Sequence, residues 1–333
     1  MKKYENILID VRGGTGKNIA LASILSEVKE HYRLVSVISP YYDIFKACPY
    51  CDYAYRPEQY KSALEDAGED TYIAIDHIYD TDAFIRKEIS YADAFRRLCL
   101  IPEKNDKEHG MNIKSNLNTK RVADFSVMLK QFLDKIHEAG KEDFIIFQHT
   151  GGQTPLISLQ APKDANGNVD WAKIPYTGAD NGLSRHYPTD KASEFVGLFK
   201  QAHPKTAVVS YTLPNEPVAE GSMRFIMPYL SYVDIAQLPE CKGIVTIDSS
   251  LQHLTAGLTR TVVMWHHTLP QSFGYAYNLN LVARCKREGI KYFSALGASG
   301  NRIEYIEPAV LLDYVEKCLF KHEFDSTPTM IEF

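Results

Sequence analysis

The 333-residue sequence lacks a long hydrophobic run, so it contains no candidate membrane-spanning helix. The apolar part of its first ten residues is too short for a secretory signal peptide. It also lacks a strong charge of either sign: the net charge of −5 excludes a whole-surface attraction to nucleic acid or anionic membranes, although a local basic groove stays open. Cysteine is scarce, and six cysteines in a chain this long indicate reduced thiols. We therefore expect a cytoplasmic protein.

The motifs that could hold a metal are incomplete. Cys48 and Cys51 form one Cys-x-x-Cys pair without a second ligand pair nearby, so we interpret them as packing thiols rather than a zinc or redox site. Residues 164–170 alternate Asp and Asn like a calcium loop, but the bidentate Glu is missing. The Asn-Gly pair at 166–167 is instead typical of a hairpin turn. Neither motif predicts a metal site.

Strand-like and helix-like segments alternate in two series. In the first, apolar runs at 6–11, 33–39 and 71–78 are separated by helical patterns, of which the first covers 17–32. The second series begins with an apolar run at 143–152, after a long helical pattern that stops at Gly140. Such alternation predicts parallel sheets with helices on both faces, and two series in 333 residues predict two α/β domains. We place the division near residue 140.

A glycine-rich loop follows the first predicted strand and opens a helix. Its residues are Gly13, Gly14, Gly16 and Lys17. Glycines there let backbone N–H groups approach a phosphate at a helix N-terminus. The loop differs from the ATP-binding template G-x-x-x-x-G-K-[ST], because Val11 replaces the first Gly and Asn18 replaces the hydroxyl residue that holds Mg²⁺. A deviant P-loop ATPase, similar to partition-type ATPases, is therefore an alternative.

The run GIVTIDSSLQHLTAGLTRTVVMWHHTLPQSFGY, residues 243–275, is more specific. It resembles the donor-binding segment of the ADP-heptose:lipopolysaccharide heptosyltransferases and their relatives, glycosyltransferase family 9. Residues 248–253 (Asp-Ser-Ser-Leu-Gln-His) are similar to the family's Asp-Ser-Gly-x-x-His helix entry. Residues 266–270 (His-His-Thr-Leu-Pro) are similar to its Gly-x-Thr-x-Pro turn. The resemblance extends over most of the chain, except near 103–118 and 155–182.

Upstream segments carry the same resemblance. The strand and glycine loop at 144–152 look like those of the family, and Arg185 stands where the family usually has Lys. Glu216 matches the acidic residue after the next strand, and the opening loop looks like the family's R-x-G-G-x-G-D segment.

Residues 80–82 (Asp-Thr-Asp) mimic the metal-holding D-x-D of the other glycosyltransferase fold, although short acidic pairs are common in loops.

The resemblance implies the GT-B fold, in which two Rossmann-like domains face each other across a cleft. It implies an acceptor domain at 1–140, a nucleotide-sugar donor domain at 141–308, and a segment at 309–333 that packs back toward the N-terminal domain. It also implies a metal-independent, inverting transferase without a cofactor, in which Arg185 binds the diphosphate, Glu216 the ribose and Asp248 the sugar hydroxyls. The donor-binding residues implied are Thr150, Gly151, Gly152, Arg185, Glu216, Asp248, Ser249, Ser250, His253 and Thr268.

One departure concerns the catalytic base. The family has Asp directly after the G-x-G of the opening loop, and this sequence has Lys17, which as a protonated amine cannot take a proton from the acceptor. Another residue would then serve, and the candidates are Asp10, His77, Asp80 and His149. Alternatively Lys17 binds a phosphate on the acceptor, or the protein binds nucleotide-sugar without catalysis. We favour a changed active site over an inactive one.

A lipopolysaccharide core-like glycan is the family's usual acceptor, and a modified nucleobase, a protein side chain or a small molecule are alternatives.

Overall fold

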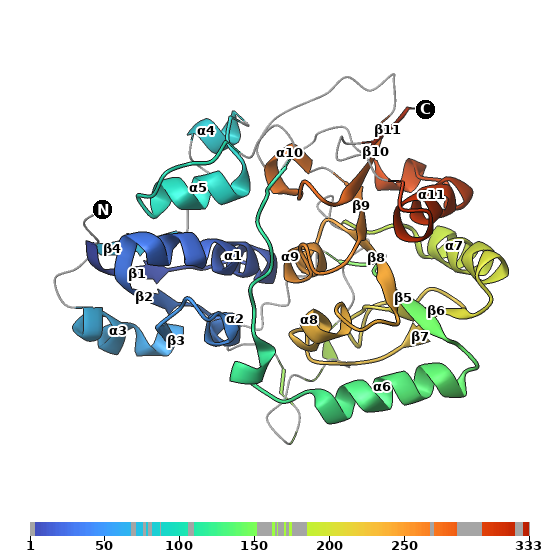
Figure 1. Ribbon diagram of the computed structural model, residues 1–333, viewed down its shortest axis with the longest axis horizontal. Coiled ribbons are helices and arrows are strands. Elements are labelled where there is room, and N and C mark those ends of the chain that lie inside the picture. The colour runs from blue at the N-terminus through green and yellow to red at the C-terminus, as the bar shows by residue number, and fades with distance from the viewer. Residues whose placement is uncertain are drawn as a thin grey trace.

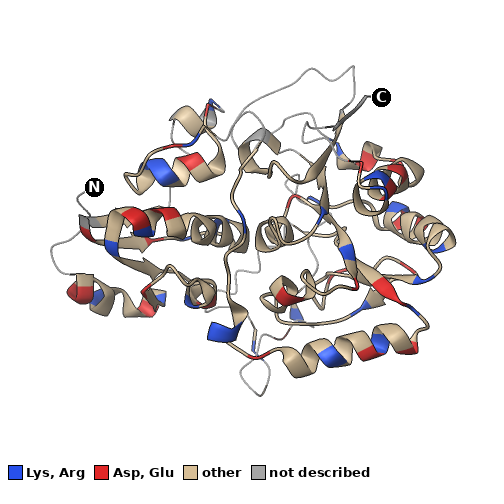
Figure 2. Ribbon diagram, viewed as in Figure 1, with Lys and Arg blue, Asp and Glu red and all other residues tan. Residues whose placement is uncertain are grey.

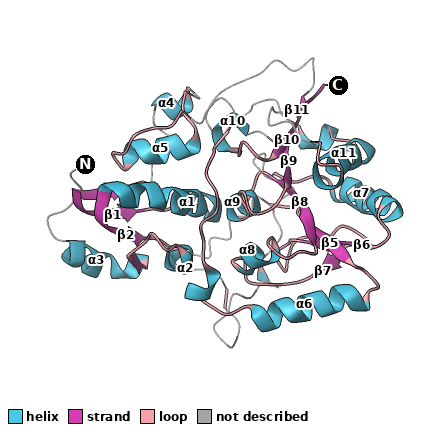
Figure 3. Ribbon diagram, in the orientation of Figure 1, coloured by secondary structure: helices cyan, strands magenta, loops and turns pink. Residues whose placement is uncertain are grey.

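The computed structural model describes residues 4–67, 71–75, 78, 82–86, 88–105, 110–151, 162–163, 165, 170, 173–174, 185–266, 270–284, 302–323 and 329–332. These residues form an α/β fold with two parallel sheets, one of four strands and one of seven (Figures 1 and 3). The two predicted series of alternating strands and helices are thereby confirmed. No helix within these ranges is both long and apolar enough to cross a membrane.

The four-stranded sheet has the order β3-β2-β1-β4. Its strands are β1 (Tyr4–Asp10), β2 (Tyr32–Ile38), β3 (Tyr53–Tyr55) and β4 (Thr71–Ala74). Its helices are α1 (Thr15–His31), α2 (Tyr42–Ala47), α3 (Tyr60–Ala67), α4 (Asp82–Ile85) and α5 (Tyr91–Leu98). The central strand β1 buries Ile7, Leu8 and Ile9 in succession, the continuous apolar pattern of a parallel strand covered on both faces.

The seven-stranded sheet has the order β11-β10-β9-β8-β5-β6-β7. Its strands are β5 (Asp143–Phe147), β6 (Thr206–Ser210), β7 (Met223–Arg224), β8 (Cys241–Ile247), β9 (Thr261–Trp265), β10 (Leu279–Arg284) and β11 (Thr329–Glu332). The helices around it are α6 (Ser126–Glu138), α7 (Thr189–Ala202), α8 (Ser231–Ile235), α9 (Ser250–Leu254), α10 (Pro270–Phe273) and α11 (Pro308–Val315). The strand order changes direction at β5 and β8, so this sheet has a topological switch point there.

Helix α6 corrects the division predicted near residue 140. The ring of Phe132 packs edge-on against Phe144 of β5, with 5.0 Å between the ring centroids, and against Phe225 at 4.8 Å. Figure 1 shows α6 below the seven-stranded sheet. The helix therefore packs with the second sheet, since its apolar stripe faces β5 rather than the first domain.

The C-terminal segment also differs from the prediction that residues 309–333 pack back toward the N-terminal domain. Helix α11 packs on α7, and the π-helical turn that follows it (Glu316–Phe320) lies against β8 and β9. Strand β11 pairs with β10 at the edge of the second sheet. Leu311 and Val315 share a buried cluster with Phe195 and Phe199 of α7, so the prediction is wrong for the described residues.

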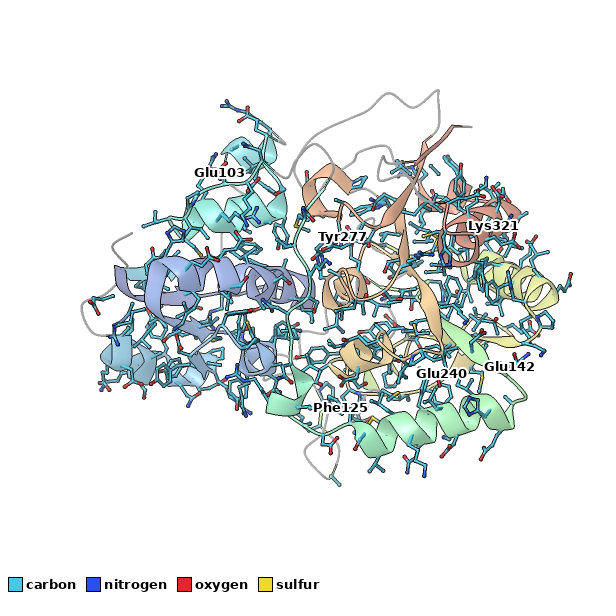
Figure 4. All side chains as sticks on the ribbon, in the orientation of Figure 1. Glu103, Phe125, Glu142, Glu240, Tyr277 and Lys321 are labelled. Carbon is cyan, nitrogen blue, oxygen red and sulfur yellow. The ribbon has the colours of Figure 1, made fainter. Side chains whose placement is uncertain are left out.

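The two sheets are joined by direct packing of their helices. Helix α1 lies against α9, and one hydrophobic cluster contains buried residues from both sides (Figure 4). On the α5 side, Tyr91 packs against Phe273 of α10 with 5.1 Å between the ring centroids. Lys17 is the one charged residue in the first half of α1, and Figure 2 shows the acidic residues of this helix at the end away from α9.

The chain between the sheets is bonded to both. Met111 donates its backbone N–H to the Gly274 carbonyl, and Ser115 donates to that of Ala256, both on the side of the second sheet. The backbone N–H of Asn118 donates to the Ala47 carbonyl on the side of the first sheet. Residues 110–118 thus cross the junction of the two sheets.

Candidate functional site

Polar residues gather where the strands of the second sheet end. Because all strand pairs of this sheet are parallel, their carboxyl ends meet at one edge, which we call the carboxyl edge. Residues 148–151 follow β5 and residues 248–249 follow β8, the strand that pairs with β5. The predicted donor residues from these two segments are therefore brought together.

Arg185 and Asp248 form an ion pair at this edge. Nη1 of Arg185 lies 3.1 Å from Oδ2 of Asp248 and donates to the Asp248 backbone carbonyl at 2.9 Å. The side chain of Asp248 is 3% exposed and that of Arg185 is 31% exposed. Oδ1 of Asp248 accepts a hydrogen bond of 2.6 Å from Nε2 of Gln252. A buried carboxylate thus holds a partly exposed guanidinium.

Ser249, and not Asp248, caps helix α9. Ser249 has an extended backbone (φ −148°, ψ −178°), and its Oγ accepts from the N–H of Leu251 at 3.3 Å. Ser250 is the first residue of the helix. The Asp248 carboxylate therefore does not cap the helix, and it contacts Arg185 and Gln252 instead.

Gln148 links the turns after β5 and β8. Its Oε1 accepts from Oγ of Ser249 at 2.5 Å and from Oγ1 of Thr246 at 2.8 Å. Its Nε2 donates to the Thr150 carbonyl at 2.9 Å. Gly151 is closely packed, because a Cβ there would lie 2.7 Å from Cδ1 of Ile247. Gln148 fixes the loop after β5 relative to the start of α9.

Glu216 lies beside Thr150. Oε2 of Glu216 accepts from Oγ1 of Thr150 at 3.0 Å and from the backbone N–H of Leu213 at 2.7 Å. Burial raises the pKa of the Glu216 carboxyl, and these two hydrogen bonds partly oppose that shift. The loop after β5 and the acidic residue after β6 therefore lie together.

His253 lies where the opening loop meets α9. Its Nδ1 is 2.8 Å from the hydroxyl oxygen of Tyr275, and burial lowers its pKa to about 4, so the ring is neutral at pH 7. A Cβ on Gly16 would come within 2.9 Å of Cδ2 of His253 and 3.7 Å of the Ser250 Cα. The opening glycine loop therefore touches the helix that carries the Asp-Ser-Ser segment.

The opening loop is not arranged like a P-loop at the position of the missing hydroxyl. Nδ2 of Asn18 donates to the Gly14 carbonyl at 2.9 Å, and its Oδ1 accepts from Oγ of Ser39 at 2.6 Å. Gly13 has φ +100°, where a side chain would be strained. Lys17 is buried, with 5% of its surface exposed. Because Asn18 ties the loop to the end of β2, its amide does not replace a metal-binding hydroxyl.

Two of the candidate bases lie in the described residues. Asp10 ends β1 and pairs with Arg12 through Nε to Oδ1 at 2.7 Å and Nη2 to Oδ2 at 3.0 Å. His149 is fully buried, burial lowers its pKa to about 4, and neither ring nitrogen has a hydrogen-bond partner among the described residues. The remaining candidates and donor residues, His77, Asp80, Gly152 and Thr268, lie outside the described residues.

The motifs interpreted as structural behave as such where they are described. Cys48 and Cys51 are buried, and burial raises both thiol pKa values, that of Cys48 to about 11, so neither is a reactive thiolate. His266 accepts from the Ile303 backbone N–H at 3.2 Å. In the part of the chain that the structure describes, no group of three or more His, Cys, Asp or Glu is placed to hold a metal ion. Most of the calcium-like segment 164–170 lies outside that part.

Three residues of this site carry no sequence signal that would have singled them out. They are Gln148, Gln252 and Tyr275. Each acts through a hydrogen bond to a residue that folding brings close, and glutamine and tyrosine are too common in loops to mark a site. Of the three, only Gln252 lies inside the helix-entry motif at 248–253, at one of its variable positions.

The architecture is that of GT-B-like glycosyltransferases, an α/β fold with two parallel sheets. A family 9 glycosyltransferase from Veillonella parvula DSM 2008 superposes with a TM-score of 0.62 at 10% identity, covering 96% of this chain and 99% of that one. The iron-containing dodecameric glycosyltransferase TibC from enterotoxigenic E. coli H10407 gives 0.59 at 9% identity, covering 97% and 78%. E. coli ADP-heptose LPS heptosyltransferase II gives 0.54 at 13% identity, covering 96% and 100%.

Comparison of sequences gives no match to a protein-family model and none to a curated protein. The likeness is therefore one of fold, and at that level it confirms the resemblance to glycosyltransferase family 9 that the motifs predicted.

Proposed function

We propose that the protein transfers a sugar from a nucleotide diphosphate sugar to an acceptor hydroxyl, with inversion and without a metal. The observation that carries this proposal is the pair of Arg185 and Asp248 at the carboxyl edge of the second sheet, beside the N-terminus of α9. A guanidinium that a buried carboxylate holds in place can neutralise the charge of a leaving diphosphate. This is the task that a metal ion performs in other transferases.

The donor would bind along the second carboxyl edge. Arg185 would bind the diphosphate, and Glu216 with Thr150 would accept from ribose hydroxyls, because their oxygens already share one hydrogen-bonded cluster. Gly151, together with Gly152, would let the backbone approach the nucleotide. The sugar would lie near Asp248, Ser249, Ser250 and His253, with Thr268 on the following turn.

The acceptor would arrive from the first sheet, across a cleft between the two domains. Gly13, Gly14, Gly16 and Lys17 would form its wall, since this loop contacts α9 through Gly16. Lys17 would bind a negative group of the acceptor, such as a phosphate. A lipopolysaccharide core-like glycan or a modified nucleobase both offer a hydroxyl near such a group, and a cytoplasmic location suits either.

In the reaction, the acceptor oxygen forms a bond to the anomeric carbon while the bond from that carbon to the diphosphate oxygen breaks. The electron pair leaves with the diphosphate, next to Arg185. A base takes the hydroxyl proton, and of the described candidates Asp10 fits best. It lies at the end of β1 next to the opening loop, where its carboxylate pairs with Arg12. The ring of His149 is enclosed on all sides.

A second function, binding of nucleotide-sugar without transfer, is favoured by one observation, Lys17 at the position of the family's base. One assay separates the two. The purified protein is incubated with a panel of nucleotide-sugars, with and without EDTA, and release of nucleoside diphosphate is followed. We expect slow release with one donor, unchanged by EDTA. Binding of a donor without any release of diphosphate over many hours would support the second function, binding without transfer.

A further inference from the structure

Gln252 stands behind the Arg185–Asp248 pair. It is fully buried on α9, and its Nε2 donates a hydrogen bond of 2.6 Å to Oδ1 of Asp248. The other carboxylate oxygen, Oδ2, faces Nη1 of Arg185 at 3.1 Å. A carboxylate with one oxygen fixed from behind cannot rotate freely, so Gln252 determines where Oδ2 meets the guanidinium.

Arg185 needs such support. Its side chain is long and partly exposed, so holding it in one conformation costs rotamer entropy. Both contacts to Asp248 use the same nitrogen, Nη1. No described residue accepts a hydrogen bond from Nε or Nη2. That edge of the guanidinium presents two parallel N–H groups, the spacing that matches two oxygens of a phosphate.

We propose that Gln252 is a positioning residue, which acts through Asp248 to hold Arg185 with its Nε–Nη2 edge toward the donor diphosphate. The inference rests on the proposed function, because it names the ligand of that same site. It gives Asp248 a role besides contact with sugar hydroxyls. It also explains why a buried glutamine is present at a variable position of the motif.

The structure offers a substitution that separates this role from stability. Oε1 of Gln252 is buried and has no hydrogen-bond partner among the described residues. A buried acceptor without a partner is unfavourable, and replacing it with an apolar group of similar shape is nearly neutral or stabilising. Gln252→Leu should therefore leave the fold intact and remove the support of Asp248. Gln237→Leu is the matched control, because Gln237 donates only to a carbonyl of its own helical segment, that of Val233.

The experiment is a double-mutant cycle measured by calorimetry with ADP, UDP and GDP as probes. Wild type, Gln252→Leu, Arg185→Ala and the double variant are compared, with thermal unfolding as a check of the fold. We expect Gln252→Leu to weaken binding of the preferred diphosphate about three- to tenfold, the range for losing one hydrogen bond. In the Arg185→Ala background the same substitution should have no further effect, and Gln237→Leu should bind as wild type does.

Two outcomes overturn the proposal in distinguishable ways. If Gln252→Leu reduces diphosphate affinity by the same factor with and without Arg185, or does not reduce it, Gln252 does not act through Arg185. The proposed donor site would still stand. If wild type binds none of the three diphosphates, the proposed function itself fails. A rise in the KM for donor at constant kcat in Gln252→Leu, measured by diphosphate release, would add support, because a purely structural defect would lower kcat as active protein is lost.

Discussion

At the carboxyl edge of the four-stranded sheet, an arginine and an aspartate two residues apart form an ion pair, Arg12 with Asp10. At the edge of the seven-stranded sheet the equivalent pair joins Arg185 to Asp248, 63 residues away. The first pair uses two nitrogens of the arginine and both carboxylate oxygens. The second uses only Nη1, and Gln252 supports the aspartate from behind. The first pair uses the Nε–Nη2 edge of its arginine, whereas the second leaves that edge of the guanidinium for a ligand.

The surrounding hydrogen bonds differ in the same way. At the first edge, Asn18 ties the glycine loop to the end of β2. At the second edge, Gln148, Ser249, Thr150 and Glu216 connect the ends of three strands into one network. A network of this kind holds its groups in place before a ligand arrives, so no reorganisation is needed on binding. This difference is why we assign the donor to the second edge and the acceptor to the first.

Removing Arg185 should have the largest effect on function. Arg185→Ala should weaken binding of the preferred nucleoside diphosphate by about 1.5–3 kcal/mol, because a charge-assisted hydrogen bond is lost. Transfer should fall by about 10²–10³-fold, the range for removing one group that stabilises developing charge. Calorimetry and release of diphosphate measure the two quantities. Arg12→Ala is the matched control from the first edge and should leave donor affinity unchanged. Equal losses of donor affinity in Arg185→Ala and Arg12→Ala would contradict the assignment of the donor to the second edge.

The next largest effect concerns the carboxylate of Asp248. Asp248→Asn keeps an oxygen for Gln252 and loses the charge opposite Arg185. Since Ser249 is the cap of α9, the variant should unfold at nearly the wild-type temperature. We expect a folded protein whose transfer rate is reduced about 10- to 100-fold, in line with the loss of a buried charged contact. Full activity at saturating donor would mean that Asp248 is structural.

Lys17 tests the first edge directly. Lys17→Ala should reduce transfer about tenfold with the true acceptor, as expected for the loss of one charged contact. Donor affinity should stay within about threefold of wild type, because the donor lies on the other edge. Lys17→Met, which keeps the buried apolar stem, separates loss of charge from loss of packing. If donor affinity instead collapses in both variants and binding requires Mg²⁺, the ATPase alternative gains.

The smallest effect is the dependence of stability on pH. Burial lowers the pKa of His149 and of His253 from 6.5 to about 4, so between these values the unfolded chain binds more protons than the native protein. The contribution of these two histidines to the free energy of unfolding should therefore be complete above pH 6.5. It should decrease as the pH drops toward 4. Each histidine contributes at most about 1.4 kcal/mol per pH unit in this window.

Urea unfolding of His149→Leu at pH 7.5, 6.0 and 5.0 checks this expectation. The ring nitrogens of His149 have no partner among the described residues, so the variant should be as stable as wild type at pH 7.5 and less sensitive to acid. Its transfer rate should be retained, because a fully buried ring cannot reach the acceptor. An unchanged dependence on pH would show that the pKa of His149 is the same in the native and unfolded protein, and loss of transfer would restore His149 as a candidate base.

Much of the fold could be predicted because it depends on local pattern. Continuous apolar runs such as Ile7 to Ile9 mark strands covered on both faces, and the helical patterns between them require parallel pairing. The assignment of helices to sheets could not be predicted in the same way. The apolar stripe of α6 predicts that one face of the helix is buried. It does not determine whether that face packs against the first sheet or against β5. The C-terminal helix α11 was misplaced for the same reason.

In the candidate site, too, some features depend on local sequence and others on tertiary contacts. The sequence by itself determined the glycine turn at Gly13, the cap and first turn of α9, and the presence of Arg185 and Asp248, because these depend on backbone conformation and on residue type within a few positions. Only the tertiary structure decided that Asp248 meets Arg185 and that Gln148 meets Ser249, 101 residues away. The physical reason is that parallel strands from distant parts of the chain end at one edge, and which side chains meet there depends on strand order and register.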